Sequence, residues 1–302
     1  KYKLLVDNGI SPLKAYKMIF NVPEVTNPNM LIIIGSIIFV VFTLAIGTSN
    51  IGFSQEIVFI GSFAIILTLL FKLSNELDLK AKKMLLGTAI IIFAFRAMPG
   101  VGQGGSWFEI DVLGFDQEFL SLLGLIASFL TIIGIFILRP LMEKSSMTKL
   151  IVILSIAGSF FILPSIAMFY GFHEFTSKIT NGLVDARFIA IFNTALESPL
   201  GQVSMIPILA WIAQSAPNHL KATFFAVLAS FTNLALSASN LGTKYLNQIY
   251  VITREVKTNL GDIKIPADYS ELGILMIIVC LLTLVVPIGV TFIIKKLRLI
   301  SY

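Results

Sequence analysis

Long apolar runs separated by short polar segments divide this chain. A helix that crosses a bilayer needs about 20 mostly apolar residues. The pattern predicts eight membrane-spanning helices, over residues 30–48, 53–73, 84–107, 118–140, 148–170, 188–213, 220–246 and 271–296. In the sixth stretch, four residues interrupt the apolar pattern: Glu197, Ser198, Pro199 and Gly201. Without that stretch the count is seven, and the two ends of the chain fall on opposite sides of the membrane.

The distribution of basic residues favours eight spans. One set of connecting segments carries Lys1, Lys3, Lys14, Lys17, Lys72, Lys80, Lys82, Lys83, Arg139, Lys144, Lys149, Lys221, Lys295, Lys296 and Arg298. The opposite set carries fewer: Lys178, Arg187, Lys244, Arg254, Lys257 and Lys264. Cytoplasmic loops are enriched in Lys and Arg. We therefore expect both termini in the cytoplasm. A bacterial inner membrane and an organelle membrane obey the same charge rule, and we expect the protein in a bacterial inner (cell) membrane.

Composition agrees with a membrane protein. The chain is 56% hydrophobic and 13% charged, and its mean hydropathy is +0.91. A soluble domain is roughly 25% charged and 45–50% apolar. We therefore predict an all-α polytopic membrane protein, whose first partner is the lipid bilayer.

Motifs of enzymes and metal sites are missing from the sequence. The two histidines, His173 and His219, are far apart, and Cys280 is the single cysteine. No nucleotide-binding loop, nucleophile elbow or zinc-protease motif occurs. The sequence thus predicts a non-enzyme with no cofactor, no metal and no nucleic-acid partner.

The first 29 residues are polar and basic. Within residues 1–29, the segment 12–20 is predicted either as an amphipathic helix on the membrane surface or as an ordinary connecting loop. Because the chain begins with Lys1, we expect it to start partway through a longer protein.

Arg96 is a charge in the apolar run 84–101, followed closely by Pro99 and a series of glycines. An arginine at the centre of a membrane helix costs roughly 2.5–3.5 kcal/mol on insertion scales. Proline removes a backbone donor and glycine adds freedom, so the helix should loosen beyond Arg96. We expect Arg96 to face an aqueous path.

Polar residues recur at helical spacing in two other predicted spans. In 220–246 they are Ser230, Asn233, Ser237, Asn240 and Lys244; in 188–213 they are Asn193, Glu197, Gly201 and Ser204, with Gln202 beside them. A third span, 118–140, contributes Ser121, Ser128 and Thr131. Such positions line one helix face. They are interpreted either as the wall of a solute path or as hydrogen bonds between neighbouring helices.

Glu197 is the acid assigned to a span and the candidate proton carrier. An apolar setting raises the pKa of a carboxyl, whereas a nearby arginine lowers it. A couple of Arg96 and Glu197 could thus alternate between paired and unpaired states as an anion or a proton arrives. Whether the two side chains meet is left open by the sequence.

Two blocks of sequence carry a family resemblance. The first comprises residues 93–99 (FAFRAMP), 113–116 (LGFD) and 118–120 (EFL). The second comprises residues 201–208 (GQVSMIPI), 216–217 (AP), 221–226 (KATFFA) and 230–234 (SFTNL). Together they extend over about half of the chain and resemble the folate–biopterin transporter family of the major facilitator superfamily.

The resemblance implies a bundle of about 12 helices in two six-helix halves with alternating access, or about 14 helices with a linking pair. Residues 84–302 would be the C-terminal six-helix half. The hairpin within 30–83 would be either the end of the N-terminal half or the linking pair. The missing N-terminal half of the same protein is then a partner.

The segment 139–149 lies where the superfamily carries a charged gating motif, although its glycine and aspartate are absent here. We expect Arg139 and Lys144 to pair with acids or helix C-termini of the other half and to close one side of the path.

Two functions follow as hypotheses. The first is a secondary active transporter of a small organic anion, folate- or pterin-like by resemblance and proton-coupled, in which Arg96, Gln202, Asn233, Ser237 and Asn240 bind the solute. Aromatic residues such as Phe93, Phe95 and Trp107 are candidates for stacking on a planar ring. The alternative is a non-transporting membrane assembly factor that has retained the transporter fold.

Overall fold

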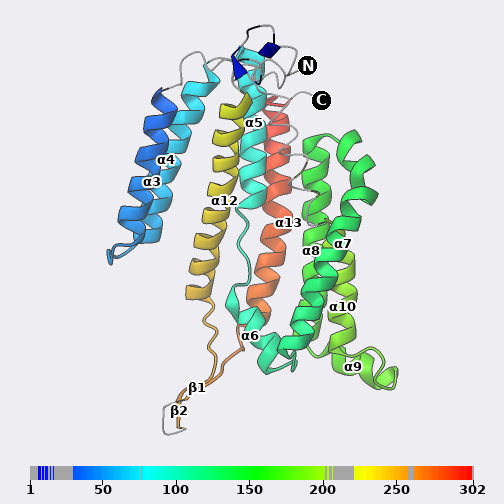
Figure 1. Cartoon of the computed structure of the whole chain (residues 1–302). Coiled ribbons are helices and arrows are strands. Elements are labelled where there is room, and N and C mark those ends of the chain that lie inside the picture. The colour runs from blue at the N-terminus through cyan, green and yellow to red at the C-terminus, as the bar shows by residue number, and fades with distance from the viewer. Residues whose placement is uncertain are drawn as a thin grey trace.

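The computed structural model describes residues 30–75, 77–200, 221–257 and 262–300, together with residues 6, 7, 9, 11, 12, 14, 16, 203 and 206. Figure 1 shows these residues as a bundle of roughly parallel and antiparallel helices. The candidate Gln202 and most of the possible helix at 12–20 lie outside the described residues.

The bundle is built from long helices joined by short connections. The helices are α3 (Met30–Gly47), α4 (Ser54–Ser74), α5 (Leu79–Arg96), α6 (Gln103–Asp111), α7 (Gln117–Lys144), α8 (Met147–Phe169), α9 (Phe172–Ile179), α10 (Ala186–Glu197), the 3-10 helix η1 (Ser198–Leu200), α12 (Lys221–Ile249) and α13 (Leu272–Lys296). Strands β1 (Val256–Lys257) and β2 (Ile263–Ile265) form an antiparallel hairpin between α12 and α13.

Five described helices are long and apolar enough to cross a membrane: α4, α7, α8, α13 and residues 224–249 of α12. Large apolar side chains such as Phe71, Phe129 and Phe136 are exposed on them, which suits a surface that contacts lipid. The prediction of a helical polytopic membrane protein is confirmed.

Helix starts are set by side-chain caps. Asp78, Asp116 and Asp185 each accept a hydrogen bond from the backbone N–H three residues later, at 2.7–2.8 Å. Such a cap satisfies one of the N–H groups that a helix N-terminus leaves without a partner. These aspartates therefore fix where α5, α7 and α10 begin.

The helices turn back at two ends of the bundle. The end at which α5 begins and α13 finishes carries Lys72, Lys80, Lys82, Lys83, Arg139, Lys144, Lys149, Lys295, Lys296 and Arg298, and is called the basic end. The opposite end, which holds α6, α9, β1 and β2, is called the hairpin end (Figure 1).

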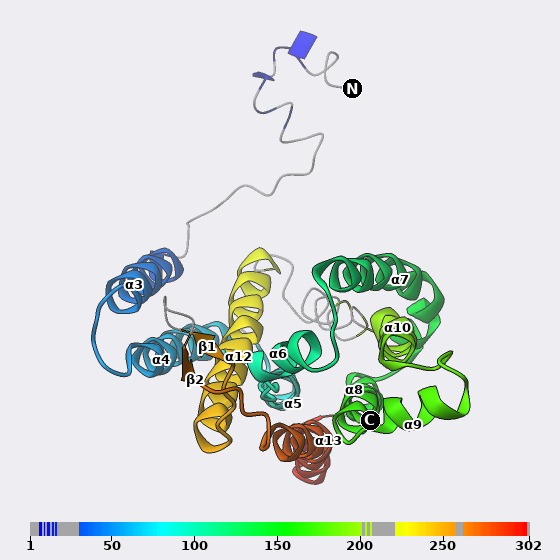
Figure 2. The same cartoon turned by 90° about the horizontal axis from the view of Figure 1, so that it is seen from below.

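Two apolar clusters join the helices. Ile66 of α4 packs with Leu85 of α5 and Phe224 of α12, and a second cluster joins α5 and α8 to α13. Seen from below, α12 lies between the α3–α4 pair and α6, with α7, α8 and α10 on the far side of α5 (Figure 2). The helix pair α3–α4 thus packs on the bundle through α4, whereas α3 exposes most of its apolar residues.

Small residues allow the helices to approach closely. Ser159 of α8 donates to the carbonyl of Cys280 of α13 at 2.9 Å, and the Cys280 thiol donates back to the Ser159 carbonyl at 3.4 Å. Gly134 of α7 lies against the backbone of Pro199 in η1, where a Cβ would overlap it. Close contacts of this kind are what hold helices together in lipid.

The predicted continuous helix over 84–107 is wrong. Helix α5 begins earlier, at Leu79, and ends at Arg96; after an irregular segment, α6 begins at Gln103. Arg96 is therefore the last residue of a helix rather than the middle of one. Pro99 and Gly102, with φ of 79° at Gly102, account for the break.

Candidate functional site

The irregular segment between α5 and α6 is held by one face of α12. Three polar side chains, each four residues from the next, bind its backbone. Ser239 donates to the carbonyl of Met98 at 2.6 Å, Thr243 accepts from the N–H of Gly100 at 2.8 Å, and Asn247 donates to the carbonyl of Val101 at 3.2 Å. Non-helical backbone within a membrane needs such partners or a water-filled cavity.

Glycine is required where this segment meets α12. A Cβ on Gly102 would lie 2.8 Å from the amide nitrogen of Asn247, and Gly102 also has a positive φ. A Cβ on Gly104 would lie 2.8 Å from Ile252. The glycine run in the sequence therefore serves close approach of α6 to α12 as well as flexibility.

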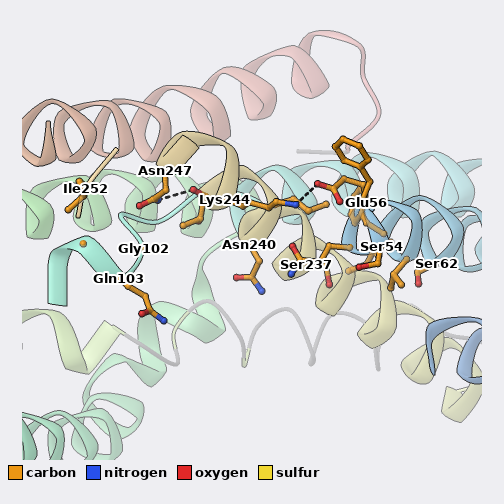
Figure 3. A pocket seen from close by; sticks show the side chains of 18 of the residues that line it. Ser54, Glu56, Ser62, Gly102, Gln103, Ser237, Asn240, Lys244, Asn247 and Ile252 are labelled. Atoms are coloured by element: carbon orange, nitrogen blue, oxygen red, sulfur yellow. Dashed lines mark hydrogen bonds and ion pairs between the residues drawn. The ribbon is translucent and has the colours of Figure 1, made fainter. Parts of the chain in front are cut away.

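A cavity of about 1050 Å³ lies beside this break, between α4, α6 and α12. Its lining combines the first turns of α4, residues 102–104 with Trp107, and α12 from Leu234 to Asn247. Figure 3 shows Ser237 and Asn240 on α12, Gln103 on α6 and Ser54 on α4 around it. Sites for small organic molecules have volumes of roughly 300–1,000 Å³, so the cavity can accommodate one.

An ion pair crosses the cavity. Lys244 Nζ of α12 lies 2.7 Å from Glu56 Oε1 of α4 (Figure 3). The Tyr245 hydroxyl donates to the same oxygen at 2.9 Å. The Glu56 side chain is 15% exposed, and its Oε2 is buried without a hydrogen bond to a described residue. The pair thus joins two helices and leaves one carboxylate oxygen able to take a further partner or a proton.

Glu56 is a candidate site residue that sequence reasoning missed. It falls inside the predicted span 53–73, so Glu197 is not the only acid within a span. The sequence signal that could have identified Glu56 was its position near the start of the apolar run 53–73. Its pairing with Lys244, 188 residues away, is a property of the tertiary structure.

The predicted solute-binding residues are only partly brought together. Ser237 and Asn240 line the cavity, as does the aromatic candidate Trp107. Asn233 is exposed on α12 and does not line the cavity, and neither does the half-buried Arg96. Phe93 packs against Phe63 and Phe231 in the core instead.

Glu197 ends α10 and is exposed. The ion pairs of the described residues do not include one between Glu197 and Arg96. Arg139 and Lys144 lie within the last turns of α7 rather than in a loop. Arg139 Nε is 2.7 Å from Glu143 Oε1, one turn along the same helix.

A second charged cluster lies at the hairpin end. Arg254 donates to both carboxylate oxygens of Asp111 at 2.7 and 2.8 Å, and the Tyr269 hydroxyl donates to the same carboxylate at 2.7 Å. The hydrogen bonds from Arg254 hold the pKa of Asp111 below its usual value, whereas burial and the Asp111 carboxylate raise the pKa of Tyr269 to about 12. This cluster fastens the segment after α12 to the end of α6.

Glu109 on α6 behaves differently from Asp111. It lines a small cavity of about 180 Å³ with Phe108, Ser165 and Met276, and burial raises the pKa of its carboxyl. Within the described ranges, no three His, Cys, Asp or Glu side chains gather in a way that would hold a metal ion.

Comparison with known proteins assigns the chain to a protein family. Residues 78–302 match the BT1 family, which is most of the chain. The chain belongs to the BT1 family. It is also 23% identical over 154 residues to a curated protein of Synechocystis sp. named "Folate-biopterin transporter". The predicted resemblance to the folate–biopterin transporter family is thereby confirmed.

The match to the Synechocystis protein covers 51% of this chain and 30% of that relative. The chain therefore accounts for less than a third of its relative's length. No solved structure matches the chain.

Proposed function

We propose that this chain is part of a secondary active transporter of a small organic anion, folate- or pterin-like, which binds in the cavity between α4, α6 and α12. The observation that carries the proposal is the Lys244–Glu56 ion pair inside a cavity beside a broken helix. Broken helices and charged side chains that line a cavity between membrane helices are typical of transport sites. The name of the Synechocystis relative supports the class of solute.

The cavity offers three kinds of contact, two from α12 and one from α6. Asn240 and Ser237 supply amide and hydroxyl groups that match the polar edge of a pterin, and Trp107 supplies a flat face for stacking. Lys244 supplies the positive charge for a carboxylate. Arg96, at the end of α5, remains our prediction for a second cation on the path.

Coupling is proposed to act through the ion pair. An incoming carboxylate competes with Glu56 for Lys244, and Glu56 released from the pair takes up a proton because an unpaired carboxylate is unfavourable in an apolar setting. Glu197 is the second candidate for the proton. This exchange would link solute binding to the relative motion of α4 and α12.

Alternating access requires a second group of helices on the other side of the solute path. We propose that the remaining half of a major facilitator-type bundle provides it, with the basic end in the cytoplasm of a bacterial cell and Arg139 and Lys144 in the inner gate. The exposed polar face of α12, which includes Ser230 and Asn233, supports this, because it is the face that such a half would cover.

The test is uptake of labelled folate and simple pterins by proteoliposomes that contain the full-length protein, with and without an inward proton gradient. We expect gradient-dependent accumulation, and a fall of roughly tenfold or more in Asn240→Ala, as is usual when a bidentate polar contact is lost. Asn233→Ala is the matched variant on the same helix outside the cavity and should change uptake less.

Three outcomes would alter the proposal. Normal uptake by Arg96→Ala would remove that residue from the path. A greater loss in Asn233→Ala than in Asn240→Ala would move the solute along α12, away from the described cavity. No uptake by demonstrably folded protein would remove the transport function.

A further inference from the structure

A pocket at the basic end brings five cationic side chains together. It has a volume of about 540 Å³ and lies between the start of α5 and the end of α13. Its charged lining consists of Lys80, Lys83, Lys295, Lys296 and Arg298, and no acid that the structure describes is part of this lining. None of the five forms an ion pair with any residue that the structure describes.

The end of α13 is folded so that it contributes Arg298. The N–H of Arg298 donates to the carbonyl of Lys295 at 3.0 Å and the N–H of Leu299 donates to that of Ile294 at 3.3 Å, which closes the helix in a Schellman motif. This motif places Arg298 at φ 54°, a conformation that favours glycine. A long cationic side chain thus occupies the position where glycine would be the easier residue.

Glycine is found instead on the opposing helix. A Cβ on Gly87 of α5 would lie 2.9 Å from both the Leu299 carbonyl oxygen and Cγ1 of Ile300. The absence of a side chain at Gly87 lets the end of α13 lie directly against α5. Figures 1 and 2 show these two helices side by side. The fold therefore brings the two groups of cations together rather than separating them.

The lysines of α5 are in an electrostatically unfavourable place. Cations near a helix C-terminus are stabilised by the helix dipole, which accounts for Lys295 and Lys296 at the end of α13. Lys80 and Lys83 lie in the first turns of α5, where the dipole opposes positive charge. The Asp78 carboxylate caps this helix start but forms no ion pair with either lysine. A bound anion would offset the remaining positive charge.

We propose that this pocket binds the phosphate group of an anionic membrane lipid. A phosphate carries the opposite charge and offers several acceptor oxygens to lysine and arginine donors. Met84, Leu299 and Ile300 form the apolar part of the lining, and Leu86 and Phe292 are exposed on the same two helices. An apolar wall that continues along lipid-facing helices can contact the acyl chains of a lipid. The same apolar side chains offer no hydrogen-bond donor to a free phosphate ion.

The experiment uses the full-length protein in detergent and native mass spectrometry, with phosphatidylglycerol and phosphatidylcholine of equal chain length as probes. We expect preferential retention of phosphatidylglycerol. Each basic residue near an anionic surface is worth roughly a fivefold change in binding, so Lys83→Gln with Arg298→Gly should weaken retention roughly 25-fold. The matched control, Lys72→Gln with Lys149→Gln, removes two exposed charges from the same end outside the pocket and should change retention less than about twofold.

Arg298→Gly separates binding from folding. Glycine is favoured at this backbone position, so the single variant should keep or raise the melting temperature while it weakens lipid retention. Equal retention of the two lipids by the unaltered protein would overturn the proposal. Equal loss in the pocket and control variants would also overturn it. Displacement of the lipid by millimolar inorganic phosphate would assign the pocket to a free anion and overturn the lipid assignment.

Discussion

The two ends of the bundle use charge in opposite ways. At the hairpin end, ion pairs join separate elements: Arg187 with Asp116, Arg254 with Asp111 and Lys244 with Glu56, each at 2.7 Å. At the basic end, the ion pair among the described residues is that of Arg139 with Glu143, inside a single helix. Where both signs of charge meet, they fasten the fold. Where one sign dominates, the cations form no ion pair between separate elements within the described part of the chain.

The largest change is expected from the ion pair in the cavity. Lys244→Met leaves the Glu56 carboxylate, 15% exposed, without its cationic partner. The Lys244 side chain is 36% exposed, so the pair is only partly buried. Loss of its cation leaves the carboxylate uncompensated, and the melting temperature should fall by about 3 °C. Thermal unfolding of the full-length protein in detergent, followed by fluorescence, measures this.

Two further variants sharpen that result. Glu56→Gln combined with Lys244→Met removes both charges and should recover most of the loss. Lys178→Met makes the same chemical change at an exposed lysine of the hairpin end and should leave the melting temperature nearly unchanged. A fall in Lys178→Met as large as that in Lys244→Met would show that the ion pair does not fasten α4 to α12.

An intermediate change is expected at Asp111, and it depends on pH. The pKa of Asp111 in the fold is below its ordinary value of 3.8, first because of the hydrogen bond from Arg254. The stabilisation is therefore complete above pH 3.8 and is lost as the pH falls through the lower pKa of the folded state. Arg254→Gln should lower the melting temperature by about 2 °C near pH 7.

The check is a series of melting temperatures between neutral and strongly acidic pH. The difference between the unaltered protein and Arg254→Gln should shrink as the medium becomes more acidic, since protonation of Asp111 breaks the pair in either protein. A difference that stays constant with pH would mean that Arg254 stabilises through packing alone.

The smallest change is expected at the basic end. Arg139 and Glu143 are 71% and 58% exposed, and exposed pairs one helical turn apart contribute little. Arg139→Gln should shift the melting temperature by less than about 1 °C. The matched variant is Arg187→Gln, because Arg187 connects α10 to the start of α7 and lies 5.1 Å above the Phe119 ring. If both variants gave equal shifts, the contrast between the two ends would not hold.

Much of the candidate site was readable from residue spacing. The spacing of polar positions on 220–246 put Ser237 and Asn240 on one helix face, and both line the cavity, whereas Asn233 in the same register does not. The spacing also put Lys244 on this face, but it did not predict the ion pair of Lys244 with Glu56. Ser239, Thr243 and Asn247 form a second face with a spacing of four, and their role was missed because their partners are backbone groups of another segment.

The segment around Arg96 was partly predictable. Pro99 and the following glycines indicated a loosened helix, and the structure confirms a break. The extent of the break was not predicted. It depends on the tertiary contacts of Gly102 with Asn247 of α12 and of Gly104 with Ile252 just after α12. The position of Arg96 at a helix end follows from that packing and not from its hydropathic surroundings.

The sequence by itself determined the class of the protein, the approximate limits of most helices and their alternating direction, because each long apolar run must satisfy its backbone hydrogen bonds within itself in lipid. The resemblance to the folate–biopterin transporter family was likewise carried by local motifs. Only the tertiary structure decided which charges meet. Glu56 and Lys244 are far apart in the chain. Arg298 lines the same pocket as Lys80 and Lys83, where Gly87 lets the residues after α13 lie against α5. Apolar periodicity is a local property, whereas ion pairs, cavities and close glycine contacts depend on how whole helices pack.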